Sequence, residues 1–195
     1  MMKQLFIIPI IVFCLSSLNG QRVIGYYPQW VQSSFTPDKI DYSVITHVIH
    51  SFAWPDEQGN ILHYDNMLSQ SVNNTVHDNG AKILLCFGGW GQSWGFSASM
   101  STPELREIFI DNIISICETY DYDGVDIDWE QPVNVTEKNN LTIFIAELRQ
   151  AFDDLYPDWI ISMAVPVSNW SGQYYDFNQL KESVDFFNAM TYDIH

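Results

Sequence analysis

Short apolar runs recur along the chain, and segments with helical spacing of apolar residues lie between them. The runs that predict strands are residues 22–27, 45–53, 82–87, 124–129, 159–165 and 185–192. Most of them are apolar throughout rather than alternating, which is typical of strands buried on both faces of a parallel sheet. This alternation of strands and helices predicts an α/β fold with right-handed crossovers.

Two helices are clearly predicted, one after the third run and one after the fourth. Thr102 or Ser101 can cap the first, with Pro103 in its first turn. Apolar residues at helical spacing fill both segments: Leu105, Ile108, Phe109, Ile113 and Ile116, then Leu141, Phe144, Ile145, Leu148, Phe152 and Leu155. Shorter helices are predicted near residues 65–77 and 178–183.

A doubly wound sheet and a (β/α)8 TIM barrel both fit this alternation. The first predicted strand is not followed by GxGxxG, so a dinucleotide-binding fold gains no support. Polar residues and glycines gather at the ends of the strands, which favours a barrel with its site at the carboxyl face. A barrel needs eight strands and usually about 250 residues. We therefore expect a C-terminally truncated barrel that reaches about the sixth strand, and we expect residues 21–195 alone to fold poorly.

The N-terminus predicts secretion. A short basic start is followed by the apolar run LFIIPIIVFCL and then by small and polar residues up to Gly20. This run is too short to span a bilayer and fits a secretory signal peptide over residues 1–20. Four N-x-S/T sequons, at Asn73, Asn134, Asn140 and Asn169, agree with a secreted glycoprotein.

The charge limits the kinds of partner that the protein can bind, and the cysteine content argues against a disulfide scaffold or a metal site. The formal net charge is −16, from 24 acidic and 8 basic residues, so nucleic acid is excluded as a partner because little could neutralise its phosphates. Neither a membrane anchor nor an oligomer is implied. The cysteines Cys86 and Cys117 lie in apolar stretches and predict buried free thiols. No metal or other cofactor is expected, since CxxC and HExxH are absent.

Three carboxylates in one buried run carry the chemistry. Period two places Asp126, Asp128 and Glu130 on one face of the fourth predicted strand, and it turns Trp129 to the opposite face. Burying like charges is costly and pushes their pKa values apart, so that one group keeps its proton near neutral pH. A protonated acid beside an ionised carboxylate is what cleavage of a glycosidic bond requires.

The segment DGVDIDWE, residues 123–130, closely resembles the DGxDxDWE signature of family-18 glycoside hydrolases, the chitinase family. Further matches follow in the family's order along nearly the whole chain: GYYPQW at 25–30, SFAW at 51–54, CFGGW at 86–90 and MTYD at 190–193. The resemblance implies a catalytic domain with the TIM-barrel fold, of which residues 21–195 form a part.

The resemblance also implies a substrate-assisted retaining mechanism. Glu130 would protonate the glycosidic oxygen, and the substrate's own acetamide oxygen would attack the anomeric carbon. Asp128 would orient the acetamide, Asp126 would hold Asp128, and Tyr192 would donate a hydrogen bond to the acetamide oxygen. The implied substrates are chitin and chitooligosaccharides, whose β-linked sugars carry the required N-acetyl group.

Substrate-binding residues are expected around these groups. Asp193 and Met190 come from the last motif, and the remaining candidates are Tyr26, Trp30, Phe52, Trp54, Gly89 and Trp90. Sugar rings stack on aromatic faces, although packing alone also accounts for an aromatic such as Phe52, and Gly89 can instead serve close backbone approach.

Some residues depart from the family pattern. Cys86 stands where the family has serine, and its thiol is a weaker donor toward Asp126. Gln131 replaces an aromatic residue that many chitinases carry. The sequence predicts a secreted, extracellular chitinase, and two alternatives stay open: a non-catalytic chitin-binding lectin, and an endo-β-N-acetylglucosaminidase acting on N-glycans.

Overall fold

The computed structural model describes residues 21–192. The predicted signal peptide, residues 1–20, and the candidate Asp193 lie outside the described residues.

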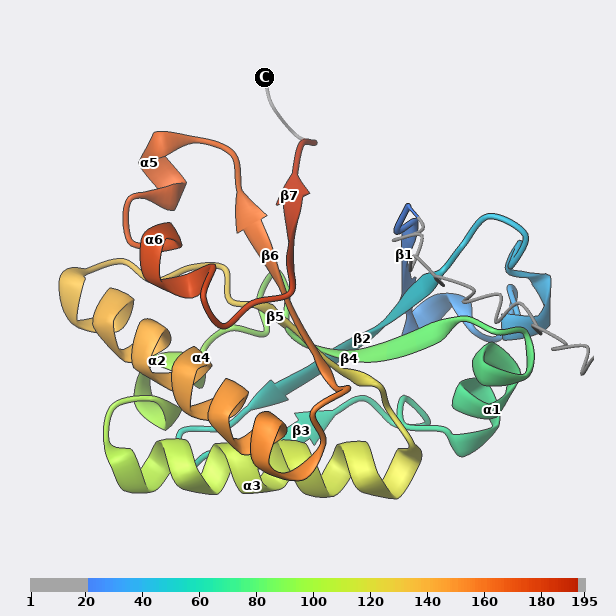
Figure 1. Cartoon of the computed structure of the whole chain (residues 1–195), viewed down its shortest axis with the longest axis horizontal. Helices are drawn as coiled ribbons and strands as arrows, with labels where there is room; N and C mark the ends of the chain where they lie inside the picture. The colour runs from blue at the N-terminus through green and yellow to red at the C-terminus, as the bar shows by residue number, and fades with distance from the viewer. Residues whose placement is uncertain (1–20, 193–195) are drawn as a thin grey trace, which may run out of the picture.

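Six parallel strands form a curved sheet in the order β1-β2-β4-β5-β6-β7 (Figure 1). Their bounds are Ile24–Pro28 (β1), His47–Pro55 (β2), Lys82–Gly88 (β4), Gly124–Asp128 (β5), Ile160–Pro166 (β6) and Phe186–Met190 (β7). All six predicted strands are confirmed, and this arc is an incomplete TIM barrel as expected. A short strand that was not predicted, β3 at Ile61–His63, pairs antiparallel with the end of β2.

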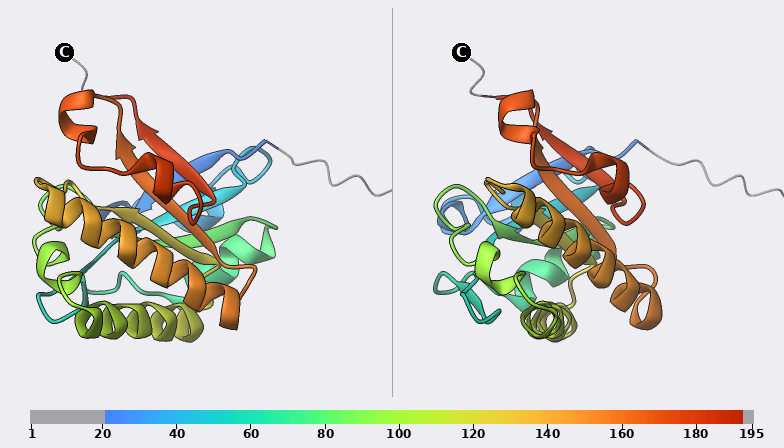
Figure 2. Two further views of the ribbon diagram at one scale, coloured as in Figure 1. Left: turned by 60° about the vertical axis from the view of Figure 1, so that its left-hand side comes forward. Right: turned by 90° about the vertical axis from the view of Figure 1, so that its left-hand side faces the viewer.

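Helices connect these strands on the outside of the arc. Their bounds are Gln70–Asp78 (α1), Phe96–Ser99 (α2), Pro103–Tyr120 (α3), Val135–Leu155 (α4), Asn169–Gly172 (α5) and Phe177–Leu180 (α6), with 3-10 turns at Gln29–Val31 and Pro37–Lys39. The two long helices, α3 and α4, lie side by side along one face of the sheet (Figures 1 and 2). Both were predicted from their apolar spacing, and Thr102 rather than Ser101 caps α3.

Two apolar clusters bury the two faces of the strands. The larger lies between sheet and helices, where Phe109 packs edge-on against Phe87 and stacks on Phe144, with ring centroids 5.7 and 5.0 Å apart. The smaller lies on the inner face of the arc and contains Ile49, Leu84, Cys86 and Ile160. Burial on both faces explains why the strand sequences are apolar throughout.

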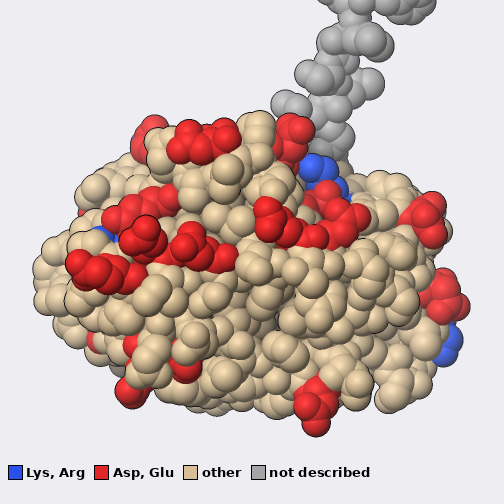
Figure 3. All heavy atoms as spheres, turned by 90° about the horizontal axis from the view of Figure 1, so that it is seen from below, with Lys and Arg blue, Asp and Glu red and all other residues tan. Residues whose placement is uncertain are grey.

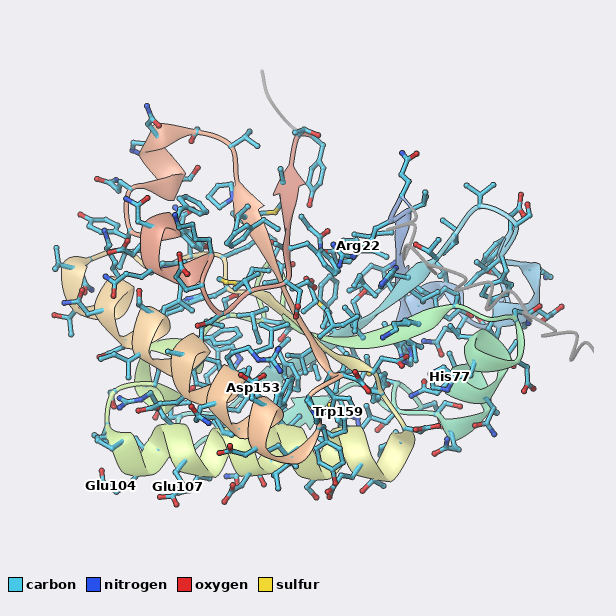
Figure 4. All side chains as sticks on the ribbon, in the orientation of Figure 1. Arg22, His77, Glu104, Glu107, Asp153 and Trp159 are labelled. Atoms are coloured by element: carbon cyan, nitrogen blue, oxygen red, sulfur yellow. The ribbon has the colours of Figure 1, made fainter. Side chains whose placement is uncertain are left out.

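The edge strands β1 and β7 contact each other through side chains, although their backbones are not paired in the sheet. The Arg22 guanidinium carbon lies 5.0 Å from the centroid of the Phe186 ring, and Figure 4 shows Arg22 between the two strands. Nearer the carboxyl ends, Asn188 Nδ2 donates to Tyr26 Oη at 3.3 Å. These contacts bring β1 and β7 residues to the same side of the central strands.

The surface agrees with the acidic composition, and the burial of one sequon asparagine changes the expectation of glycosylation. Seen from below Figure 1, the surface shows many carboxylates and few basic groups, in line with the net charge (Figure 3). Asn73 is fully buried and its amide donates to the Tyr120 carbonyl at 2.7 Å, so this sequon cannot carry a glycan in the folded protein. Within residues 21–192, no helix is both long and apolar enough to span a bilayer.

A second sequon asparagine, Asn134, stabilises the start of a helix. Asn134 is the N-cap of α4, and its Oδ1 accepts the backbone N–H of Glu137 at 2.9 Å. We expect Asn134→Ala to lower the free energy of unfolding by about 1 kcal/mol, because a helix N–H loses its partner. Denaturant unfolding of the full-length gene product measures this, with exposed Asn139→Ala on the same helix as the control. Equal losses in both variants would contradict the capping role.

Candidate active site

The end of β5 delivers the predicted carboxylates. Val125 and Ile127 face the helices within the larger cluster, so Asp126 and Asp128 face the inside of the arc, as period two predicts. β5 ends at Asp128, and Glu130 follows in a loop rather than in the strand. Between them, Trp129 is buried against Phe96 with ring centroids 5.5 Å apart, which confirms its predicted outward direction.

Asp126 is fully buried, and four donors from four other strands surround its carboxylate. Tyr26 Oη on β1 and Cys86 Sγ on β4 donate to Oδ2 at 2.9 and 3.2 Å. Ser162 Oγ on β6 and Asn188 Nδ2 on β7 donate to Oδ1 at 2.5 and 3.0 Å. Burial raises the pKa of Asp126, and these hydrogen bonds oppose that rise. The carboxylate thereby ties β1, β4, β6 and β7 to β5.

Asp128 lies two residues further along β5, on the same face of the strand, and it has fewer hydrogen-bond donors around it than Asp126. It is 5% exposed, and its Oδ1 has no hydrogen-bond partner among the described residues. Burial first, and then the charges of Asp126 and Glu130, raise the pKa of Asp128 to about 8. This carboxyl group therefore keeps a proton near neutral pH and can donate it in a hydrogen bond. Its buried Oδ1 is in addition able to accept a hydrogen bond from a ligand.

Glu130 is half-buried, and hydrogen bonds to its backbone and to that of Trp129 hold it in place just past the end of β5. Its N–H donates to Ser93 Oγ at 3.0 Å, and on the preceding residue the Trp129 carbonyl accepts Tyr175 Oη at 2.6 Å. Burial raises the pKa of Glu130. A carboxylic acid with a raised pKa at an accessible position suits a general acid.

Two glycines let β4 approach this loop. Gly88 has φ +113°, and a Cβ there would lie 2.1 Å from the Asp128 carbonyl oxygen. Gly89 has φ +85°, donates its N–H to the same oxygen at 2.8 Å, and would bring a Cβ within 2.8 Å of the Phe52 ring. The structure thus gives both glycines a role in close packing behind the site.

Two hollows meet at Glu130. The smaller, about 330 Å³, is lined by Tyr26, Trp30, Phe52, Tyr64, Trp90, Gln92, Asp128, Glu130 and Tyr192. The larger, about 1070 Å³, is lined by Trp90, Glu130, Gln131, Val133, Pro166, Val167, Ser168, Trp170, Ser171, Met190 and Tyr192. Trp90, Glu130 and Tyr192 border both, so the two hollows form one cleft that runs past the acid on either side.

The structure brings most predicted substrate-binding residues into this cleft. In the smaller hollow, Trp30 stacks on Phe52 with ring centroids 6.0 Å apart. Two candidates lie outside both linings: Gly89, which packs behind Phe52, and Trp54, whose ring meets Tyr64 edge-on at 5.0 Å.

Sequence reasoning missed several residues of the site. They are Ser162 and Asn188 beside Asp126, Ser93 beneath Glu130, and Tyr64, Gln92 and Trp170 in the cleft. Ser162 and Asn188 left a signal, because each is a polar residue inside an apolar strand run. The described residues hold no cluster of three or more His, Cys, Asp or Glu side chains suited to a metal ion. The thiols of Cys86 and Cys117 are free and buried, as predicted.

Comparison with known proteins places this site in a family. The sequence profile of the glycosyl hydrolases family 18 matches residues 22–195. Mouse (Mus musculus) chitotriosidase-1 is 29% identical over 200 residues, covering 91% of this chain and 42% of that protein. Probable chitinase 10 of Drosophila melanogaster is 29% identical over 204 residues, covering 89% of this chain and 8% of that protein.

A solved structure is similar as well. A mutant of catalytic domain 2 of the Group II chitinase from Ostrinia furnacalis, in complex with (NAG)5, superposes with a TM-score of 0.81 at 28% identity. The match covers 89% of this chain and 51% of that chain. The present chain thus spans about half or less of the proteins it resembles here. Since the family profile matches nearly all of the described residues, the chain belongs to the glycosyl hydrolases family 18.

Proposed function

We propose that the protein containing this chain is a secreted chitinase that hydrolyses β-1,4-linked N-acetylglucosamine polymers. The observation that carries the proposal is the pairing of Asp128 with Glu130. Asp128 is a buried, protonated acid with an unpartnered oxygen, and Glu130 is a half-buried acid at the junction of the two hollows. The chitinase names of the relatives and the (NAG)5 in a related domain agree with this substrate class.

The reaction needs no protein nucleophile. Glu130 gives its proton to the glycosidic oxygen as that bond breaks, and the acetamide oxygen of the substrate bonds to the anomeric carbon, giving an oxazolinium ion. An oxygen of Asp128 accepts a hydrogen bond from the acetamide N–H, which orients the acetamide and stabilises the charge that develops on it, while Asp126 holds Asp128 in place. Glu130, now a carboxylate, takes a proton from water, and the water oxygen opens the oxazolinium ring. The reacting acetamide is already part of the substrate, which lowers the entropic cost of attack.

The side chains around these groups have supporting tasks. Tyr192 borders both hollows at Glu130, where its hydroxyl would donate to the acetamide oxygen. Asp193, next in the chain, would contact the sugar. The aromatic residues Tyr26, Trp30 and Phe52 would pack against the sugars over Asp128, and Met190 and Trp90 would line the path beyond Glu130.

Turnover by the full-length gene product tests the proposed function. We expect hydrolysis of a fluorogenic chitotrioside and of colloidal chitin, together with secretion of a protein that begins near Gln21. Binding to chitin without any turnover would contradict the proposal and favour a lectin. Release of N-glycans from a glycoprotein, with chitotrioside untouched, would assign the activity to N-glycan cores instead.

A further inference from the structure

Most of the exposed aromatic residues lie in the two hollows that meet at Glu130. Single exposed apolar residues are ordinary on proteins, but a group of them in a concave site marks a binding surface. Trp90 is 87% exposed and Trp170 is 79% exposed, and both line the larger hollow with Glu130. Val133 and Val167, also exposed, line the same hollow.

The position of Trp170 is not explained by packing of the core. Trp170 lies on α5, a four-residue helix after β6 in which no residue is buried. Local hydrogen bonds fix the backbone there, since Ser168 Oγ accepts the Ser171 N–H at 3.1 Å and Gln173 Nε2 donates to the Trp170 carbonyl at 2.8 Å. The segment therefore holds a large aromatic side chain at the rim of the cleft without burying it.

The lining of the larger hollow indicates the chemistry of its ligand. Glu130 is the one charged residue among the described residues that line it, in a protein with a formal net charge of −16. The polar groups that remain are the neutral side chains of Gln131, Ser168 and Ser171, with the hydroxyl of Tyr192. A neutral ligand rich in hydroxyl and amide groups, with flat apolar faces, matches aromatic walls and neutral hydrogen-bonding groups. A sugar chain has this character.

The two hollows are not equivalent for the reaction. Asp128 lines only the smaller hollow, whereas Glu130 lines both. Under the proposed function, on which this step rests, the sugar whose acetamide reacts lies over Asp128. The proton from Glu130 goes to the bond on the far side of that sugar, so the larger hollow receives the leaving part of the chain. Its volume of about 1070 Å³ is slightly above the upper end of the range for small-molecule sites, about 1,000 Å³.

We propose that Trp170, which lines the larger hollow together with Trp90, is a specificity-determining residue that stacks on a sugar of the leaving chain. The consequence is a preference for oligosaccharides that extend past Glu130 over substrates with a short leaving group. Stacking of this kind contributes equally before and in the transition state, so it lowers KM more than it raises kcat.

The test compares two substrates in the full-length gene product. They are tetra-N-acetylchitotetraose and a fluorogenic chitobioside with a small aryl leaving group. We expect Trp170→Ala to lower kcat/KM for the tetramer by about tenfold, mainly through KM, and to change the aryl substrate less than about twofold. Trp170→Phe should restore most of the loss. The control is Trp94→Ala, because Trp94 is 53% exposed yet lines neither hollow.

The outcomes separate this inference from the proposed function. If the wild type hydrolyses the substrates and Trp170→Ala affects both equally, or neither, the role of Trp170 is overturned while the chitinase stands. If the wild type hydrolyses nothing, the proposed function fails, and calorimetric binding of the tetramer then decides about Trp170. A Kd about tenfold weaker in Trp170→Ala than in Trp94→Ala supports the stacking role, and an unchanged Kd or no binding by the wild type overturns it.

Discussion

We expect Glu130→Gln to lower kcat on chitooligosaccharides by about 10³-fold, within the range of general acid catalysis. The amide keeps the shape of the side chain and cannot donate the proton that the leaving oxygen needs. KM should change little, because Glu130 lines the cleft without carrying the aromatic contacts that bind sugar. Steady-state hydrolysis of tetra-N-acetylchitotetraose by the full-length gene product measures the loss.

The matched control for this variant is Glu107→Gln. Glu107 is an exposed residue on α3, and Figure 4 shows it pointing away from the sheet. The control should retain wild-type kcat, while both variants should unfold at the same denaturant concentration. If Glu130→Gln kept more than about a tenth of wild-type kcat, Glu130 would not be the general acid.

The contribution of Asp128 to the free energy of unfolding should fall as pH rises from about 4 to about 8. Burial and the neighbouring carboxylates raise the pKa of Asp128 from 3.8 to about 8 in the folded protein. The folded state then holds a proton that the unfolded state has released, so this contribution is fully present below pH 3.8 and is lost through pH 8. Each unit of pKa shift corresponds to ~1.4 kcal/mol, and the full loss is on the order of 6 kcal/mol.

Denaturant unfolding at pH 4.5 and pH 8 measures this dependence. Asp128→Asn removes the titrating group, so its free energy of unfolding should decline much less over the same interval than that of the wild type. The exposed Asp158, in the turn before β6, supplies the control, since Asp158→Asn should leave the wild-type slope in place. A wild-type slope in Asp128→Asn would show that Asp128 is ionised throughout this range.

The central part of the fold was predictable because each strand is buried on both faces. Continuous apolar runs therefore gave the six parallel strands, and helical spacing gave α3 and α4. Short elements such as β3 and α5 left little signal, because three or four residues are too few to establish a period. Their conformation depends on pairing with β2 and on side-chain caps rather than on their own apolar pattern.

The residues of the candidate site likewise fall into two groups, those that local sequence pattern predicts and those that it does not. Asp126 and Asp128 were predictable from strand period alone, whereas Glu130 lies past the end of β5 and is positioned by Ser93, which is 37 residues distant in sequence. Trp170 also escaped prediction, since its nearness to Glu130 follows from how β6 lies against β5. Residues that act through the topology of the sheet cannot be located by local pattern.

Substrate assistance by the acetamide group is the central claim, and the anomer formed first from tetra-N-acetylchitotetraose tests it most directly. Proton NMR during the first minutes of hydrolysis by the full-length gene product distinguishes the two anomers before they equilibrate. Attack by the acetamide oxygen, followed by water from the opposite side, predicts that the new reducing end appears as the β-anomer. The same protein should leave the fully de-N-acetylated tetramer intact. Initial formation of the α-anomer, or cleavage of the de-N-acetylated tetramer at a similar rate, would contradict the account.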